Sequence, residues 1–348
     1  MRGDRMGVMA DETAELTPGS DPWLAQVVEE VIDPDQRIVD PHHHLWPLGG
    51  ALPYGLAQLH SDTGAGHLVE ATVFVECGAG YRTDGPDHLK PVGETEFVAA
   101  AGVASAQAIG QAEIKGIVAN ADLTLGDKLA DVLDAHEAAG RGRFRGIRHS
   151  GARDPDPSAL MIPGRAPAGL YADESFRNGM AELGERGLTF DAWHYHHQAD
   201  EFRALVAAVP GTTMVLDHFG TPLGVGRFEG QRDAVFETWK DDIAALAELP
   251  NVVAKIGGLA MPDNGFGWHT ADRPPTSDEF VAVQARYYLH TIECFGPERC
   301  MFESNFPVDR FSISYAVMWN GLKKIVADFS QADRDAMFFA TAERVYSL

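Results

Sequence analysis

Three consecutive histidines follow an aspartate in the segment DPHHHLW, residues 40–46. Successive side chains of a β-strand point to opposite faces, so Asp40, His42 and His44 are expected on one face and His43 on the other. Two imidazoles with this spacing can present two nitrogens to one point. That arrangement suits a divalent metal ion, or two hydrogen-bond donors to one substrate oxygen. The His42 and His44 pair is therefore the first candidate site of the chain.

Other residues capable of acid–base or ionic chemistry gather near the ends of later β-rich segments. A carboxylate there could take a proton from water, an imidazole could stabilise negative charge, and a cation could hold an anionic group. An asparagine cannot take that proton at neutral pH. These residues are Glu76, Arg148, His149, His194, Tyr195, His196, His197, Asp217, His218, Lys255, Glu303 and Asn305.

Eight β-rich segments alternate with helical patterns along the chain. The segments are RIVDPHH (37–43), ATVFVEC (71–77), IKGIVAN (114–120), RFRGIRHS (143–150), GLTFDAWHY (187–195), TTMVLDHF (212–219), NVVAKIGG (251–258) and RCMFESN (299–305). Helices are predicted over 94–108, 127–139, 173–186, 199–209, 233–248, 278–294, 313–327 and 331–345, with a weaker one within 54–68.

This alternation predicts parallel strands joined by right-handed crossovers, and eight units fit an α/β fold of the (β/α)8 TIM-barrel type. An open doubly wound sheet is the alternative, but it usually carries a Gly-rich phosphate turn after its first strand, which this sequence lacks. We expect a flexible tail over residues 1–24 and a single barrel domain over 25–348. Two long Gly/Pro-rich loops, 151–175 and 258–279, are expected on the C-terminal face, where barrels build their active sites.

Composition excludes several classes of partner. The formal net charge of −23 disfavours nucleic acid and anionic membranes, and an anionic substrate would need local cations in its pocket. No segment approaches the length of a membrane span, and the N-terminal residues lack the apolar stretch of a signal peptide. Three cysteines with no metal-binding spacing suit a reducing compartment, so a cytoplasmic protein is expected. Assembly as a homo-oligomer stays open.

Six segments together resemble the amidohydrolase-2 branch of the amidohydrolase superfamily, in order over residues 36–348. They are DPHHHLW, TVFVEC, RFRGIRH, VLDHFGTPLG, VVAKIGGL and CMFESNFPVDR. The branch includes 2-pyrone-4,6-dicarboxylate lactonase, L-fuconolactonase and sulfomuconolactone hydrolase. The resemblance implies a distorted (β/α)8 barrel that hydrolyses a cyclic ester or a similar carbonyl compound.

The resemblance also implies a set of metal ligands. His42 and His44 match the pair on the first strand, His218 matches the histidine on the sixth strand, and His196 is the expected fifth-strand member. Some members of the branch bind one divalent cation, such as Zn²⁺ or Mn²⁺, and the pyrone lactonase works without one, so both alternatives stay open here. Arg148 matches an arginine of the fourth strand that could hold a carboxylate or a carbonyl group.

The eighth strand departs from the family pattern. Its usual Gly-Ser-Asp-Trp-Pro reads ESNFP in this chain, so Asn305 replaces the aspartate that serves as general base or metal ligand. Glu303 lies two residues earlier and would share a face with Asn305 in a regular strand. We therefore hypothesise that Glu303 supplies the carboxylate and that Asn305 orients the water or a ligand. The alternative is a structural role for Glu303 as partner of Arg148 or Lys255.

The expected function is the opening of a small lactone by water. Glu303, Asn305, His218 and Arg148 are the predicted catalytic residues, and substrate contacts are predicted for Arg148, Tyr195, His196, Lys255 and Trp268. Arg148 and Lys255 would anchor an acidic substituent, which makes an acidic lactone one expected substrate. Decarboxylation, amide hydrolysis or a non-catalytic binding barrel are the alternatives. Serine-hydrolase, P-loop and His-Glu-x-x-His motifs are absent from the sequence.

Overall fold

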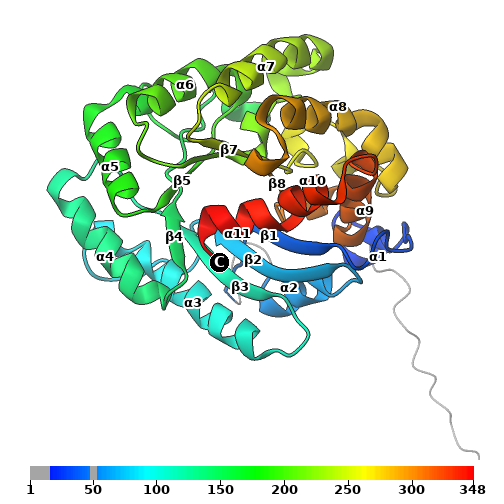
Figure 1. Ribbon diagram of the computed structural model, residues 1–348, viewed down its shortest axis with the longest axis horizontal. Coiled ribbons are helices and arrows are strands. Elements are labelled where there is room, and N and C mark those ends of the chain that lie inside the picture. Colours follow the sequence, from blue (N-terminus) through cyan, green and yellow to red (C-terminus); the bar gives the residue numbers. More distant parts are fainter. Residues whose placement is uncertain (1–15, 48–52) are drawn as a thin grey trace, which may run out of the picture.

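The computed structural model describes residues 16–47 and 53–348, and its strands form one eight-stranded parallel sheet in the order of the sequence (Figure 1). Helices surround this sheet and connect its consecutive strands. The strands are β1 (Arg37–His43), β2 (Leu68–Val75), β3 (Glu113–Ala119), β4 (Phe144–Ile147), β5 (Thr189–Ala192), β6 (Met214–Leu216), β7 (Val252–Ile256) and β8 (Cys300–Phe302).

The sheet closes through the residues that follow β8. The backbone N–H of Asn305 donates to the carbonyl of His42 at 2.9 Å, and the N–H of His44 donates to the carbonyl of Phe306 at 2.8 Å. These bonds join the end of β8 to β1. The (β/α)8 TIM barrel predicted from the alternating pattern is confirmed.

Each helix predicted from the sequence has a counterpart in the structure. The helix α8, predicted over 278–294, begins at Ser277 because Thr276 caps its start: the Glu279 N–H donates to the Thr276 hydroxyl, and the Thr276 N–H donates to the Glu279 carboxylate. The helices are α1 (Asp21–Leu24), α2 (Leu56–Thr63), α3 (Val92–Gln107), α4 (Leu129–Gly140), α5 (Glu174–Glu185), α6 (Ala199–Ala208), α7 (Arg232–Ala247), α8 (Ser277–Phe295), α9 (Tyr315–Ile325), α10 (Gln331–Asp335) and α11 (Thr341–Tyr346).

Branched apolar side chains fill the inside of the barrel, as expected for strands buried on both faces. Val73, Val118, Val215 and Val253 belong to one buried cluster that also contains Tyr346 of α11. In Figure 1 the α11 helix lies across one open end of the barrel. The apolar part of the interior therefore lies at the end of the barrel that α11 covers. The polar residues lie toward the opposite end.

The two long loops lie at the carboxyl ends of β4 and β7 and are joined by one carboxylate. Asp263 accepts the backbone N–H groups of Met161 at 2.7 Å and Ile162 at 3.0 Å. The Tyr195 hydroxyl, which follows β5, donates to the Ile162 carbonyl and accepts the N–H of Gly164. These contacts hold the loop after β4 over neighbouring strand ends.

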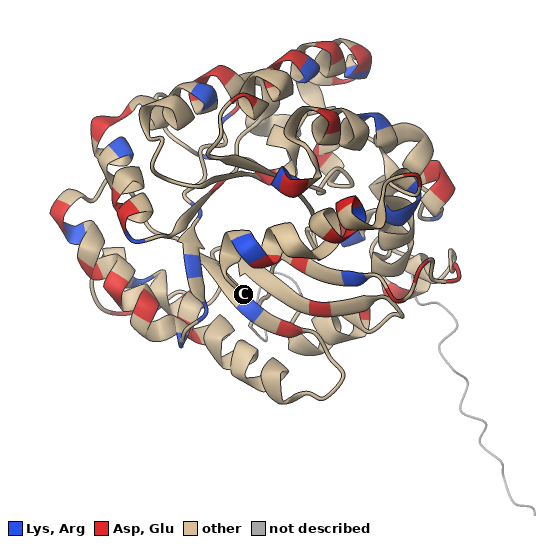
Figure 2. Ribbon diagram, in the orientation of Figure 1, with Lys and Arg blue, Asp and Glu red and all other residues tan. Residues whose placement is uncertain are grey.

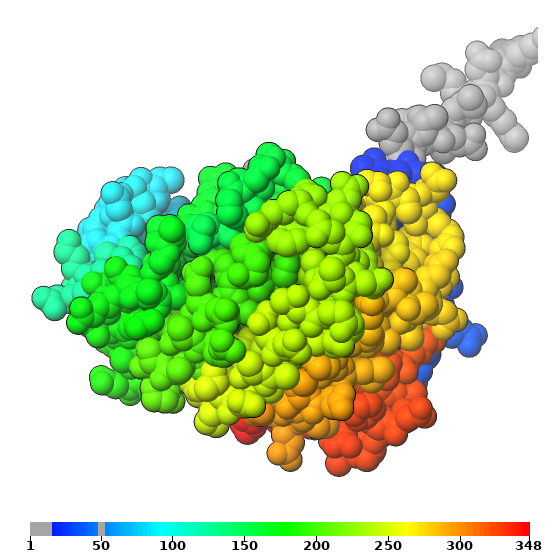
Figure 3. All heavy atoms as spheres, turned by 90° about the horizontal axis from the view of Figure 1, so that it is seen from above, coloured from blue at the N-terminus to red at the C-terminus, as the bar shows by residue number. Residues whose placement is uncertain are grey.

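The outer surface is made by consecutive helices, which follow one another in sequence order across the face seen in Figure 3. Acidic side chains are spread over these helices (Figure 2), in keeping with the net charge of −23. No helix in the described part of the chain combines the length and the apolar character needed to cross a membrane. Residues 1–15 of the expected tail lie outside the described residues, whereas Trp23 is fully buried and donates its indole N–H to the Ala271 carbonyl.

Candidate active site

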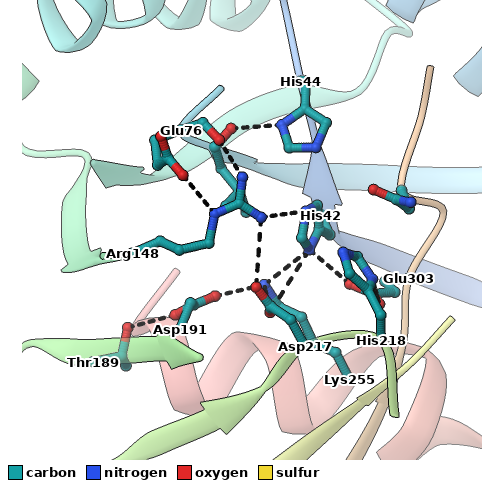
Figure 4. A network of polar contacts seen from close by, with 12 residues as sticks. His42, His44, Glu76, Arg148, Thr189, Asp191, Asp217, His218, Lys255 and Glu303 are labelled. Carbon is teal, nitrogen blue, oxygen red and sulfur yellow. Dashed lines mark hydrogen bonds and ion pairs between the residues drawn. The ribbon is translucent and has the colours of Figure 1, made fainter. Parts of the chain in front are cut away.

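Three side chains from distant parts of the sequence meet at the carboxyl end of the barrel. Nδ1 of His42 lies 2.8 Å from Oε2 of Glu303, and Nδ1 of His218 lies 2.7 Å from Oε1 of the same carboxylate (Figure 4). The residues come from β1, from the turn after β6 and from the residue after β8, and all three are buried. One carboxylate thus bridges two imidazoles, and we call His42, His218 and Glu303 the histidine–glutamate triad.

An irregularity in β1 decides which histidine enters the barrel. The register between β1 and β2 shifts between Asp40 and His43, at the position of Pro41. His42 therefore points to Glu303, while the Asp40 carboxylate accepts the Tyr315 hydroxyl of α9 at 3.0 Å on the other side of the strand. The expectation that Asp40 shares a face with His42 is wrong, because a regular pleat does not continue through this proline.

Strained backbone holds His218 in place. His218 has φ +52° and Phe219 has φ +57°, a conformation that costs a non-glycine residue free energy and occurs at functional sites. Gly258, itself at φ +74°, makes the space for the imidazole, since a Cβ there would lie 2.3 Å from Nδ1 of His218. A Cβ on Gly257 would lie 2.5 Å from Cγ of Glu303. The Gly257–Gly258 pair after β7 is thus the wall against which two triad residues pack.

Two buried cations flank His42. Nη1 of Arg148 lies 3.5 Å from its Nε2, and Nζ of Lys255 lies 3.4 Å from its Nδ1. Both cations also approach Asp217, at 3.6 Å from Arg148 and 3.3 Å from Lys255 (Figure 4). The triad is therefore embedded in a larger network of buried charges.

The network sets the protonation states of the two triad histidines in opposite directions. Burial lowers the pKa of His42 well below its usual value, and the nearby Lys255 ammonium lowers it further. Burial also opposes the charging of His218, but the Glu303 carboxylate outweighs it and raises the pKa of His218 above its usual value. His42 is held neutral, whereas His218 is the better proton acceptor.

The triad also has the donor set of a divalent metal site. One ligand atom from each of His42, His218 and Glu303 lies within 4.8 Å of the other two, and two imidazole nitrogens with one carboxylate oxygen suit Zn²⁺. Oε2 of Glu303 is buried and lies 2.8 Å from Nδ1 of His42, but among the described residues it accepts no hydrogen bond of good geometry, so it can still bind a ligand. The chemistry of these residues therefore fits one divalent cation.

The remaining residues proposed from the sequence lie outside the triad and have other partners. The His44 ring is 5.0 Å from the His42 ring, and its Nδ1 lies 2.8 Å from the Val75 carbonyl. His196 accepts the N–H of Leu223 through Nδ1, outside the triad. Trp268 stacks on Phe266 and Phe280, and the Tyr195 hydroxyl is engaged by the loop after β4.

Asn305 does not continue the eighth strand. The predicted segment 299–305 is too long, because β8 ends at Phe302 and Asn305 has φ +54°. The Asn305 side chain donates to the Asp309 carboxylate at 2.8 Å, and the same carboxylate accepts the N–H of Ala260. Glu303 and Asn305 therefore do not share a strand face, and a role of Asn305 in orienting water stays a prediction.

Three features of the site were missed from the sequence. Asp191 of β5 accepts the Lys255 ammonium at 2.6 Å, and a charged residue inside the apolar run LTFDAW was the available signal. Asp309 has no comparable signal, because its position depends on the turn after β8. The Gly257–Gly258 pair was visible in the sequence, but only the three-dimensional packing shows what it accommodates.

Known proteins resemble this chain over most of its length. The sequence pattern of the family described as Amidohydrolase matches residues 39–348. The uncharacterized protein y4mH of Sinorhizobium fredii is 32% identical over 334 residues, which are 90% of this chain and 99% of that protein. An L-fucono-1,5-lactonase of Burkholderia multivorans is 28% identical over 225 residues, covering 64% of this chain and 69% of the lactonase.

A solved structure supports the same assignment. The crystal structure of an amidohydrolase from Burkholderia multivorans with bound zinc superimposes with a TM-score of 0.67 and 25% identity, covering 89% of this chain and 99% of that one. The family pattern and the 32% identical relative both span about nine tenths of the chain. The chain belongs to the amidohydrolase family.

Proposed function

We propose that this amidohydrolase opens the ring of a small lactone by attack of water on the ester carbonyl. The observation that carries the proposal is the Glu303 carboxylate, which lies between the imidazoles of His42 and His218. A histidine paired with a carboxylate can take a proton from water and return it to the leaving group. The sequence similarity to an L-fucono-1,5-lactonase supports a lactone as the substrate.

The geometry supports His218 as the proton carrier of the proposed reaction. Its Nδ1 faces Oε1 of Glu303 at 2.7 Å, so Nδ1–H donates to the carboxylate and Nε2 is left with a free lone pair. Nε2 can accept the proton of the attacking water, and Glu303 then stabilises the imidazolium. The new carbon–oxygen bond forms as the proton moves to His218.

Collapse of the tetrahedral intermediate completes the reaction. Nη1 of Arg148, the nitrogen not bonded to Glu76, lies 3.5 Å from His42 and can donate to the negative oxygen of the intermediate. The ester carbon–oxygen bond then breaks, and the His218 imidazolium protonates the leaving alkoxide. The product is an open-chain hydroxy acid, and the histidine returns to its neutral form.

A divalent cation has a defined place in this proposal. His42, His218 and Glu303 would hold it, and when bound it would supply Lewis-acid activation of water or carbonyl in place of proton transfer to His218, which would then be a ligand. The zinc found in the similar Burkholderia multivorans structure favours zinc as the ion. Elemental analysis of protein purified without added metal is expected to find about one ion per chain. We expect the His42→Ala variant to lose that ion.

The decisive experiment compares two substitutions near the eighth strand. Wild-type protein is assayed on a panel of sugar, aromatic and muconate-type lactones. On the best substrate, Glu303→Gln is expected to lower kcat by about a thousandfold, since the amide cannot stabilise the His218 imidazolium. Asn305→Ala is expected to lower it by about tenfold or less, because Asn305 contacts Asp309 rather than the triad.

Two outcomes would refute the proposal. Full activity of Glu303→Gln would show that the Glu303 carboxylate has no part in the mechanism. Release of carbon dioxide from an active carboxylic-acid substrate, with no lactone turned over, would identify a decarboxylase instead.

A further inference from the structure

Arg148 is fully engaged by groups of the protein itself. Its Nε donates to Oε1 of Glu76 at 2.7 Å, and its Nη2 donates to the backbone carbonyl of Glu76. The remaining nitrogen faces His42 at 3.5 Å and Asp217 at 3.6 Å. The planar edge with which an arginine binds a carboxylate is therefore already occupied by Glu76.

Lys255 is neutralised in the same way. Its ammonium lies 2.6 Å from Asp191 and 3.3 Å from Asp217, and the lysine side chain is completely buried. The two cations expected to anchor an acidic substituent are thus both paired with carboxylates. A bound divalent cation would not change this pairing, since its ligands are the triad residues.

Carboxylates outnumber cations among the described residues around the triad. Each of the two cations pairs with carboxylates, namely Glu76, Asp191 and Asp217, and Glu303 joins the same network through His42 (Figure 4). Glu76 is the most exposed of these four carboxylates, with 9% of its surface accessible against none for the other three. A substrate carboxylate entering this network would meet like charge and no unmatched cationic side chain, which is unfavourable in a buried site.

We infer that the site selects an uncharged lactone over a carboxylated one, with Glu76 as the specificity-determining residue. Glu76 acts in two ways: its charge repels a substrate carboxylate, and its hydrogen bonds occupy the edge of Arg148. Ring opening creates a carboxylate from an uncharged substrate, so the same charge favours release of the product. This inference rests on the proposed lactone hydrolysis and names the class of lactone.

The first test uses three lactones that differ at one position. These are D-glucono-1,5-lactone, D-glucaro-1,5-lactone, in which the exocyclic CH₂OH is a carboxylate, and the methyl ester of the latter. Wild-type kcat/KM, corrected for spontaneous hydrolysis, is expected to be at least about tenfold lower for the carboxylate than for the other two. The ester separates charge from size, because it is larger than the acid but uncharged. Equal or faster turnover of the carboxylate would overturn the inference.

The second test assigns the discrimination to Glu76. Glu76→Gln keeps the shape of the side chain but removes its charge, and we expect the preference for the uncharged lactone to fall by about tenfold. Glu70→Gln is the matched control, because Glu70 lies on β2, which Glu76 directly follows, but pairs with Arg37 at the exposed surface. An unchanged ratio in Glu76→Gln, or an equal change in Glu70→Gln, would argue against the role of Glu76. A structural defect alone would slow both substrates alike and leave the ratio unchanged.

Binding measurements separate this inference from the proposed function. The corresponding 1,5-lactams retain the ring but resist hydrolysis, so their affinities can be measured by calorimetry even if no lactone is turned over. Tighter binding of the uncharged lactam supports the inference. Preference for the carboxylated lactam, or no binding of either lactam, overturns it. Failure of all three lactones to react would count against the proposed hydrolysis. The charge preference would then be tested by the lactam affinities alone.

Discussion

The pKa shifts of buried ionisable groups differ between the two faces of the strands. Between the barrel and its helices, burial suppresses charge: it raises the pKa of Asp40 to about 6 and lowers the pKa of His43 to about 3 and that of His136 to about 4. Inside the barrel, burial opposes charge as well, but carboxylate partners outweigh it and raise the pKa values of His218 and Lys255. The outer layer therefore keeps its histidines neutral, whereas the interior favours the charged forms of His218 and Lys255 beside a neutral His42.

The difference lies in the type of partner. The outer groups bond to neutral neighbours: His43 contacts the Thr72 hydroxyl at 3.0 Å, and His136 contacts the Thr95 hydroxyl at 2.8 Å. The interior groups face ions of opposite charge, whose attraction is strong where water is excluded. Neutral, locally bonded groups suit a structural role. Charged groups that depend on one another suit chemistry, because removal of one changes the protonation of the others.

The sharpest test of this contrast is His218→Asn. We expect kcat/KM for the best lactone to fall by about a thousandfold, because asparagine cannot carry the proton, while the free energy of unfolding changes by only about 1–2 kcal/mol. The measurements are steady-state kinetics and urea unfolding of the same samples. His290→Asn is the control, since that half-buried histidine bonds to the Lys240 carbonyl among the outer helices. A similar loss of activity in both variants would remove the distinction between the layers.

The fold could be predicted because it depends on local patterns. Alternating β-rich and helical segments and the absence of a Gly-rich turn after the first strand both favoured one topology. The ends of the strands were harder to place, since turn geometry rather than residue type ends β5 at Ala192 and β8 at Phe302. Those errors of a few residues placed His194 and Asn305 on strands that had already ended.

Site residues were predicted where a polar side chain near the end of a β-rich segment indicates them, and their orientation was missed where it depends on backbone geometry. The sequence indicated His42, His218, Arg148, Lys255 and Glu303, and the structure brings these five side chains into one network. The face of Asp40, the turn of Asn305 and the contact of Asp309 all depend on backbone irregularities. Such irregularities are set by tertiary packing, which a single sequence does not display.

Replacing one charged side chain of the barrel interior tests how strongly the buried charges depend on one another. Lys255→Met would leave Asp191 and Asp217 facing each other without their shared cation, so we expect the free energy of unfolding to fall by about 3–5 kcal/mol. Lys240→Met removes a half-exposed partner of Glu237 and should cost about 1 kcal/mol or less. Chemical denaturation of both variants gives the comparison. Equal effects would show that the interior charges are not interdependent.

The glycine wall can be tested with a matched pair of substitutions. Gly258→Ala places a methyl group against the His218 ring at a positive φ, and we expect it to lower the free energy of unfolding by about 3 kcal/mol. Gly267 has a similar φ of +76° but open space around it, so Gly267→Ala is expected to cost about 1 kcal/mol from backbone strain alone. Only the first substitution should also lower kcat, since only it displaces His218. Equal effects on stability and kcat would exclude a specific role for the wall.

The smallest expected effect belongs to the outer layer and appears only when the pH changes. Burial lowers the pKa of His43 to about 3, whereas in the unfolded chain it titrates near 6.5. As the pH falls below about 6.5, the unfolded state takes up a proton that the folded state refuses, so stability is lost progressively from there down to about pH 3. His43→Phe removes this titration and keeps a ring beside Phe74. The loss of stability between pH 7.5 and 5.5 should therefore be about 1.4 kcal/mol smaller in the variant. Parallel pH curves from urea unfolding would mean that His43 titrates alike in the folded and unfolded chain, and the contrast between the two faces of β1 would then fail.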